Sequence, residues 1–217
     1  MAGRMNCHEL APFDKTNWNS VTAAFCGAPE LHFGQHWMSK PDEALRPAVV
    51  KIGWSGSRAL FLAELVDDEI ATRAKQRNES VYLLGDVFEI FAGVAGNPAY
   101  IEYHLAPNGI IAQLRWPDAD AIKSARESGT AQFLIEENDS ILQARVEDGL
   151  WRVYGELPAS SLSGASGDLD GEVWEMSFSR YDYNADGSSH VLSSTSPHAL
   201  ASYHRRHEWR RIEFVKS

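Results

Sequence analysis

The amino-acid sequence predicts an all-β protein built as an antiparallel β-sandwich. Nine or ten short runs rich in apolar, aromatic and β-branched residues follow one another at hairpin spacing, with Gly, Pro, Asn and Asp between them. Helical periodicity is weak, and only the stretch 117–128 (PDADAIKSARES) could form a helix of useful length, short and mostly exposed. The chain has 217 residues, 44% of them hydrophobic, which is enough to bury one core. We therefore expect a single domain over residues 1–217.

The N-terminal half of the chain predicts five strands joined by turns. Their ranges are 48–54, 59–66, 85–91, 100–106 and 110–116. The first two strands flank the turn-forming sequence Ser-Gly-Ser-Arg, and the next two flank the loop sequence GVAGNP. The last strand follows Pro107-Asn108-Gly109, a strong turn signal. These connections predict antiparallel neighbours.

The C-terminal half predicts four more strands, over 141–147, 150–157, 172–181 and 209–215. Asp148-Gly149 is the best short-range hairpin signal in the chain. A two-residue turn there pairs Val146 with Trp151 and places Arg145 opposite Arg152, which is unfavourable unless acids lie nearby. The twelve-residue stretch 160–171 (SSLSGASGDLDG) indicates a surface loop within one domain.

The charge and composition oppose several classes of function. The net charge of −10 disfavours nucleic acid and an anionic membrane as partners. The basic stretch 203–211 (YHRRHEWRR) is better explained by pairing of Arg205 or Arg206 with acids of the sheet. No stretch has the apolar length of a membrane span, and the N-terminus lacks the apolar core of a signal peptide. We expect a cytoplasmic protein, or a secreted one if a signal has been removed; the oligomeric state stays open.

The two cysteines, Cys7 and Cys26, do not form a disulfide framework, and we expect both to be reduced. No Cys-x-x-Cys pair offers a zinc site.

The strand GDVFEIF places an acid on each of two apolar faces. Side chains alternate along a strand, so Glu89 shares a face with Val87 and Phe91. If Phe91 pairs with Tyr100, Glu89 lies opposite Glu102 and Val87 lies opposite His104, so that two carboxylates and an imidazole share one face. Opposed like charges destabilise a sheet, so a cation, an arginine or a set of ligand hydroxyls is expected beside them.

Two alternatives stay open for this face. It could be a solvated outer face whose acids pair with exposed Lys or Arg. Glu89 and Glu102 could instead be the two carboxylates of a retaining glycosidase, since cross-strand carboxyl groups come near the required separation.

The stretch 182–187 (DYNADG) matches the opening of a calcium-binding loop, with Asp182, Asn184 and Asp186 as ligands. The closing acid of such a loop would fall at Ser193, and a strand rather than a helix precedes the stretch. A hairpin made from turn-favouring residues is the alternative. The sequence requires no cofactor and leaves calcium open.

The order of several segments resembles the family 9 carbohydrate-binding modules and the related DOMON-like domains between about residues 46 and 214. The segments are ALFLAELVDDE, GDVFEIF, YIEYHLAPNG, DGLWRVYGELPASSL, WEMSFSRYD, LSSTSP and EWRRIEF. Asp-x-x-Glu-Ile-Phe with a following Pro-Asn-Gly strand is the most specific part. The resemblance implies a β-sandwich of jelly-roll type and a non-catalytic domain that binds a saccharide or the end of a glycan.

The resemblance also implies site residues. Glu89 corresponds to the family's strand glutamate, His104 falls where a polar or basic side chain contacts the sugar, and Arg180 lies on the strand that lines the same site. Glu102 joins them by its predicted place in the sheet.

The family's two stacking tryptophans would fall at Leu83 and Thr195, where no aromatic residue stands. Tyr82, Tyr181 or Tyr203 would then have to supply the aromatic surface.

Three functions remain on these observations. The first is carbohydrate binding in which Glu89 accepts hydrogen bonds from a ligand, or from Arg180 and His104, on a recessed sheet face. The second is a structural or accessory domain in which a buried Glu89–Arg180 pair only fixes the sheet. The third is a glycoside-processing enzyme that uses Glu89 and Glu102. Haem, which some DOMON-like domains bind, is disfavoured because no Met–His pair is placed.

Overall fold

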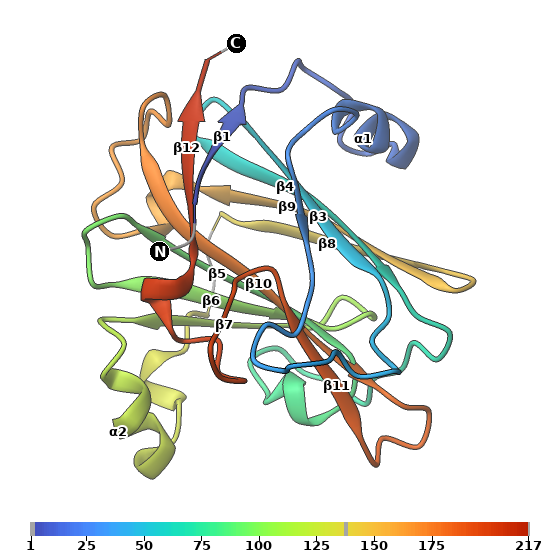
Figure 1. Cartoon of the computed structure of the whole chain (residues 1–217). Helices are drawn as coiled ribbons and strands as arrows, with labels where there is room; N and C mark the ends of the chain where they lie inside the picture. The colour runs from blue at the N-terminus through green and yellow to red at the C-terminus, as the bar shows by residue number, and fades with distance from the viewer. Residues whose placement is uncertain (1–2, 137–138, 217) are drawn as a thin grey trace.

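The computed structural model describes residues 3–136 and 139–216, and it contains two facing β-sheets (Figure 1). The smaller sheet has the order β2 (Glu30–His32), β3 (Ala48–Ser55), β4 (Arg58–Val66), β9 (Leu150–Pro158) and β8 (Ile141–Glu147). The larger sheet has the order β1 (Arg4–His8), β12 (Arg210–Val215), β10 (Val173–Tyr183), β5 (Val87–Val94), β6 (Tyr100–Leu105) and β7 (Ile111–Trp116), with β11 (His190–Ser194) beside β10. The predicted β-sandwich is confirmed, and the jelly-roll description stays a prediction.

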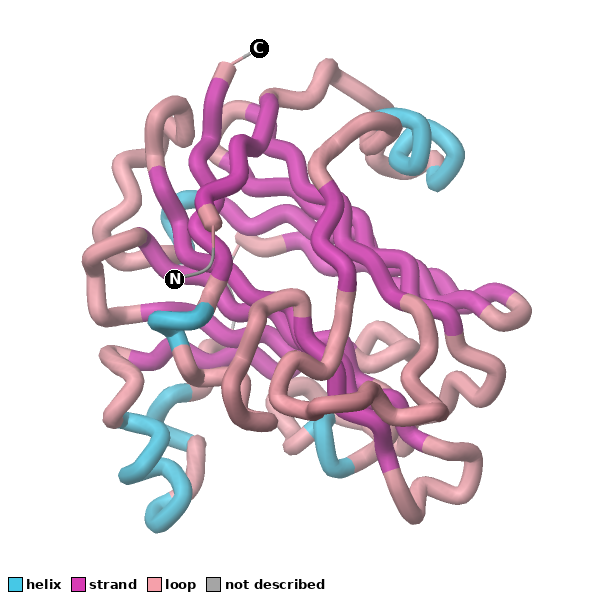
Figure 2. Tube along the Cα trace, viewed as in Figure 1, coloured by secondary structure: helices cyan, strands magenta, loops and turns pink. Residues whose placement is uncertain are grey.

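Three strands were not predicted: β1, β2 and β11. Strand β1 pairs in parallel with β12, so the first and last strands lie side by side at one edge of the larger sheet (Figure 2). The other named strand pairs are antiparallel. No short-range turn joins β1 to its partner, so local sequence could not indicate this pairing.

The main core lies between the two sheets and contains a cluster of phenylalanines. The ring of Phe61 on β4 lies 5.4 Å from that of Phe178 on β10, and Phe88 on β5 stacks on Phe178 at 5.8 Å. All three side chains are fully buried. Strand alternation therefore places Phe88 inward, and it turns Glu89 to the outer face of the larger sheet.

The Asp148-Gly149 hairpin forms as predicted. Val146 pairs with Trp151 and Arg145 pairs with Arg152. The expected acids are present, because Arg152 contacts Glu64 at 3.0 Å and both arginines contact Glu147.

The register between β5 and β6 differs from the predicted one by two residues. Phe91 pairs with Glu102 and Glu89 pairs with His104. The two strands stay paired closer to the turn than expected, and there the guanidinium of Arg206 donates to the carbonyls of Val94 (2.7 Å) and Ala99 (3.0 Å) on the two sides of the hairpin. A shift of two residues leaves every side chain on its face, so the predicted grouping of Glu89, Glu102 and His104 survives.

Two short helices and four 3₁₀ turns complete the fold. Helix α1 (Trp18–Ala24), which was not predicted, begins after Asn17, whose side chain accepts hydrogen bonds from the amides of Asn19 and Ser20. The predicted helix forms as α2 (Ala121–Ser128) and lies beside β7 (Figure 1). The 3₁₀ turns are η1 (Val81–Leu83), η2 (Ala131–Phe133), η3 (Ala159–Ser161) and η4 (Arg206–Glu208). Among the described residues, every helix is too short or too polar to cross a lipid bilayer.

Candidate functional site

A pocket of about 330 Å³ lies on the outer face of the larger sheet. Strands β5, β6, β7 and β10 contribute residues to its lining. The rest comes from residues 78–80, η1, α2, residues 130 and 134, and the segment 201–204. These covering segments bury the outer face, and every residue from Val87 to Gly93 on β5 is buried as a result. The pocket is thus a recessed site on a sheet that is covered on both faces.

Three buried ionisable side chains meet at this pocket. The exposed fractions are 3% for Glu89, 4% for Glu102 and 5% for His104. His104 Nε2 lies 2.7 Å from Glu102 Oε1 and 3.3 Å from Glu89 Oε1. Glu102 Oε2 accepts a hydrogen bond from Trp116 Nε1 at 2.5 Å. Among the described residues, Glu89 Oε2 is buried without a hydrogen-bond partner.

The environments of the two glutamates move their pKa values apart. Burial has the largest effect on Glu89 and raises its pKa to about 8. The attraction to His104 acts in the opposite direction, and the repulsion from Glu102 adds to the increase. Burial would also raise the pKa of Glu102, but His204, His104 and the hydrogen bonds from His104 and Trp116 lower it to about 2. Burial lowers the pKa of His104, and the two glutamates outweigh it and raise the value. Glu102 and His104 therefore form an ion pair, and Glu89 is the uncompensated acid.

Aromatic rings form one wall of the pocket. The Tyr82 ring meets the His104 ring edge-on at 5.7 Å and lies 6.0 Å from Tyr181. Tyr203 packs edge-on against Tyr181 at 5.9 Å. Five of the six predicted ligand-binding residues therefore line one pocket: Glu89, Glu102, His104, Tyr82 and Tyr181.

The two positions that correspond to the family's stacking tryptophans do not line the pocket. The side chain of Leu83 is 57% exposed. Thr195 is buried, and its hydroxyl accepts a hydrogen bond from the amide of Phe178 at 3.0 Å. Aromatic contact in this pocket comes from other positions.

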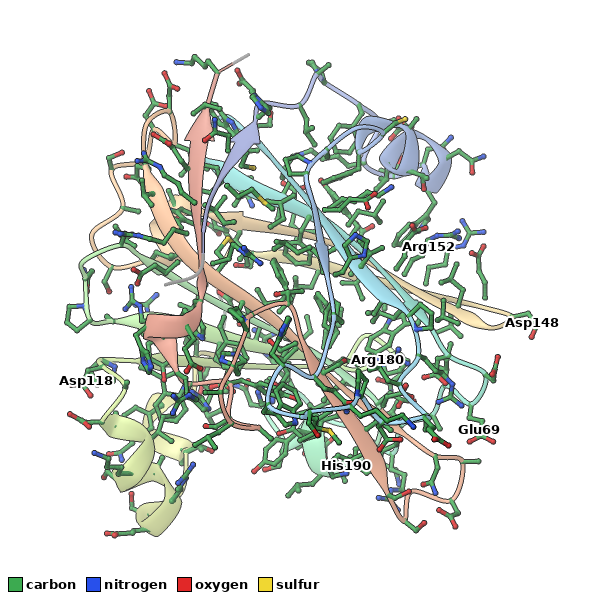
Figure 3. The ribbon with its side chains drawn as sticks, viewed as in Figure 1. Glu69, Asp118, Asp148, Arg152, Arg180 and His190 are labelled. Carbon is green, nitrogen blue, oxygen red and sulfur yellow. The ribbon has the colours of Figure 1, made fainter. Side chains whose placement is uncertain are left out.

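The sixth predicted residue, Arg180, does not join the site. It pairs directly with Phe88 across β10 and β5, so its side chain points to the inner face of the sheet. Arg180 is labelled in Figure 3. Its Nη2 lies 2.9 Å from Asp67 Oδ2 and its Nη1 donates to the Val66 carbonyl at 2.8 Å. The predicted contact between Arg180 and Glu89 is wrong, because the register between these distant strands puts the two side chains on opposite faces.

The residues of the predicted calcium loop contact separate partners. Asp182 Oδ1 accepts a hydrogen bond from Arg46 at 2.9 Å. Asn184 Oδ1 accepts from the Ser189 amide at 3.1 Å, and Asp186 Oδ1 accepts from the Ser188 amide at 2.7 Å. Asn184 and Asp186 therefore close the turn between β10 and β11, which is the hairpin that the sequence left as the alternative.

Asp182 instead belongs to a second acidic cluster. Carboxylate oxygens of Asp67, Asp86 and Asp182 lie within 4.8 Å of one another. Arg46 and Arg180 supply the positive charge, and Asp86 accepts hydrogen bonds from two backbone amides. The ion pairs and hydrogen bonds of this cluster connect the ends of β4, β5 and β10.

The sequence did not indicate two pocket residues, Trp116 and His204, that contact Glu102. Trp116 binds Glu102 directly, and His204 Nε2 lies 3.8 Å from Glu102 Oε1. His204 Nδ1 also lies 2.9 Å from the Tyr100 hydroxyl. The basic charge of the stretch 203–211 predicts only that Arg205 or Arg206 pairs with acids of the sheet. This pairing is present, because Arg206 lies 3.0 Å from Glu175 of β10. No local signal separates His204 from its basic neighbours.

The segment that carries Tyr203 and His204 is anchored by Glu208, and this anchor predicts a pH dependence. Arg205 donates to Glu208 at 2.7 and 2.6 Å, and His198 Nδ1 lies 3.1 Å away. These hydrogen bonds, those of Arg205 first, lower the pKa of Glu208 from 4.5 to about 2. Because the folded-state pKa is the lower one, the stabilisation is complete above pH 4.5 and is lost as the pH falls toward 2.

Glu208→Gln is expected to lower the free energy of unfolding at pH 7 by roughly 1.5–3 kcal/mol. The difference from the wild type should shrink when urea unfolding is repeated at about pH 3. Glu43→Gln is the control, because Glu43 pairs with Lys40 on an exposed surface. An equal difference at both pH values would contradict the role of the Glu208 charge.

The sequence matches no protein-family model and no curated protein. Solved structures do resemble the fold. A protein from Bacteroides uniformis, designated provisionally as carbohydrate-binding, aligns over 99% of this chain and 100% of its own, with 12% identity and a TM-score of 0.74.

Two structures of a family 9 carbohydrate-binding module from Caldicellulosiruptor kristjanssonii also align over 99% of this chain, both with 12% identity. For the complex with cellotriose, the TM-score is 0.66 and the alignment covers 95% of the module's chain. For the complex with glucose, the TM-score is 0.63 and the alignment covers 97% of the module's chain. At this identity the likeness establishes the fold alone. The two-sheet sandwich is therefore the architecture that these carbohydrate-binding modules share.

Proposed function

We propose that the protein is a non-catalytic domain that binds a saccharide or the end of a glycan in the pocket over β5, β6 and β10. The observation that carries the proposal is a buried oxygen of Glu89 that has no hydrogen-bond partner among the described residues and lies at a pocket with an aromatic wall. A sugar has apolar C–H faces and a rim of hydroxyls, so it suits tyrosine rings beside a buried hydrogen-bonding group. The volume of about 330 Å³ lies at the lower end of small-molecule sites.

The two other functions account for this geometry less well. In a purely structural domain, both oxygens of a buried glutamate would be paired, because an unsatisfied buried acceptor destabilises the fold. In a retaining glycosidase, both carboxyl groups act on the substrate, one as the nucleophile and the other as the general acid, so each needs an oxygen free to reach it. Both oxygens of Glu102 are occupied, one by His104 and the other by Trp116. The arrangement favours binding over hydrolysis.

The first test is a calorimetric titration of the purified protein with glucose and cellotriose, followed by a glycan array. Tyr82→Ala removes a ring of the pocket wall, and we expect it to weaken binding about tenfold. The backbone carbonyl of Tyr82, which accepts the Tyr183 hydroxyl, is retained in this variant.

Leu83→Ala is the matched control for this titration. Leu83 follows Tyr82 in the same turn, is exposed and does not line the pocket, so its affinity should equal that of the wild type. The proposal is rejected if no saccharide on the array binds the wild type, or if Tyr82→Ala binds as tightly as Leu83→Ala.

A further inference from the structure

We propose that Glu89, Glu102 and His104 bind a divalent transition-metal ion of the Zn²⁺ class at the floor of the pocket, with His204 beside them as a fourth donor. One carboxylate oxygen of each glutamate and one ring nitrogen of His104 lie within 4.8 Å of one another. The site adds an activity to the proposed saccharide binding and does not depend on it.

The spacing of the donor atoms suits a small cation. Metal–ligand distances of about 2.0–2.2 Å place neighbouring ligand atoms of a tetrahedral shell roughly 3.3 Å apart. His104 Nε2 lies 3.3 Å from Glu89 Oε1 and 2.7 Å from Glu102 Oε1. Small side-chain movements would therefore convert this cluster into a coordination shell.

The hydrogen bonds within the cluster are incomplete, which is the second observation. A single N–H on His104 Nε2 can donate well to only one of the two carboxylates that face it. Glu89 Oε2 has no hydrogen-bond partner among the described residues, and the Glu89 side chain, which is 4% exposed, is nearly closed off from water. A divalent cation between the three groups would neutralise both carboxylates and satisfy the oxygens together.

Neighbouring side chains orient two of the four donors, Glu102 and His204, as they do around metals. Trp116 Nε1 holds Glu102 Oε2 at 2.5 Å, which leaves Oε1 toward the cluster. The Tyr100 hydroxyl holds His204 Nδ1 at 2.9 Å, and His204 Nε2 then faces Glu102 Oε1 at 3.8 Å. Hydrogen bonds to the far atom of a ligating side chain fix its orientation. Mixed imidazole and carboxylate donors suit Zn²⁺ and its neighbours, whereas Ca²⁺ and Mg²⁺ take oxygen ligands.

The acidic cluster of Asp67, Asp86 and Asp182 provides an internal contrast. Its oxygens also lie within 4.8 Å of one another, but it has no imidazole, and two guanidinium groups already pair with Asp67 and Asp182. That cluster also lies away from the pocket, whereas Glu89, Glu102, His104 and His204 all line it. An ion can thus reach the proposed site from the pocket.

The test is calorimetric titration of Zn²⁺ into untagged full-length protein that has been treated with EDTA and dialysed. We expect one Zn²⁺ per chain and, with Co²⁺ as a spectroscopic probe, visible absorption bands from a low-coordinate site. His104→Gln and Glu89→Gln should each weaken Zn²⁺ binding at least tenfold, and Trp116→Phe about tenfold. Circular dichroism of each metal-free variant checks that it is folded.

Two control variants keep the comparison specific. His8→Gln removes an exposed histidine on β1, and Asp182→Asn changes the arginine-paired cluster of Asp67, Asp86 and Asp182. Both variants should bind Zn²⁺ like the wild type. The proposal is overturned if the wild type binds no Zn²⁺, or if folded His104→Gln and Glu89→Gln bind it as the wild type does. Saccharide titrations run in EDTA separate this result from the proposed function, because they can succeed or fail without any metal.

Discussion

Replacing Arg180 with methionine is expected to lower the free energy of unfolding by about 3–5 kcal/mol. Arg180 is 1% exposed and lies 2.9 Å from Asp67 and 3.2 Å from Asp182. Without it, Arg46 alone faces these buried acids, and the Val66 carbonyl loses its donor. Breaking a buried ion pair from one side leaves uncompensated charge in the interior, which is why the effect is large.

Urea unfolding at pH 7 measures this change, and an unchanged slope would show that only stability is affected. Arg145→Met is the matched control, because Arg145 pairs with Glu147 on the edge strand β8 and its side chain is 44% exposed; we expect a change below about 1 kcal/mol. Adding Asp182→Asn to Arg180→Met should restore part of the lost stability. A loss of less than about 1 kcal/mol in Arg180→Met would show that the acidic cluster does not need this cation.

Replacing Glu89 with leucine is expected to weaken cellotriose or glucose binding about 10- to 100-fold while the free energy of unfolding stays equal or rises. The buried carboxyl of Glu89 faces the charge of Glu102, and one of its oxygens has no partner. Removing it leaves the Glu102–His104 pair intact and relieves the burial of a poorly compensated acid. A residue that lowers stability where it lines a pocket is expected at a binding site.

Glu156→Leu is the matched control, measured like Glu89→Leu by urea unfolding in EDTA. Glu156 is 1% exposed, but Lys15 and Tyr154 donate to it at 2.9 and 3.0 Å. Its loss leaves those donors unpaired, so we expect a fall of roughly 1–3 kcal/mol. A comparable fall in Glu89→Leu, with saccharide affinity retained, would assign Glu89 a structural role instead.

Most of the candidate site was predictable from the sequence, and the errors in that prediction share one cause. Glu89, Glu102 and His104 belong to one hairpin, so strand alternation alone put them on the same face, even though the register differs from the predicted one by two residues. Arg180 was misplaced because its strand pairs with β5 from about ninety residues away along the chain.

The sequence by itself determined most of the strands, the Asp148-Gly149 turn and the face that Glu89 shares with its neighbours on the hairpin. These features depend on alternation and turn chemistry within a few residues. The tertiary structure alone decided that this face is covered, that His204 and Trp116 contact Glu102, and that Arg180 points to the interior. Those outcomes depend on the packing and register of segments far apart in the chain, where no local turn fixes the distance or the face.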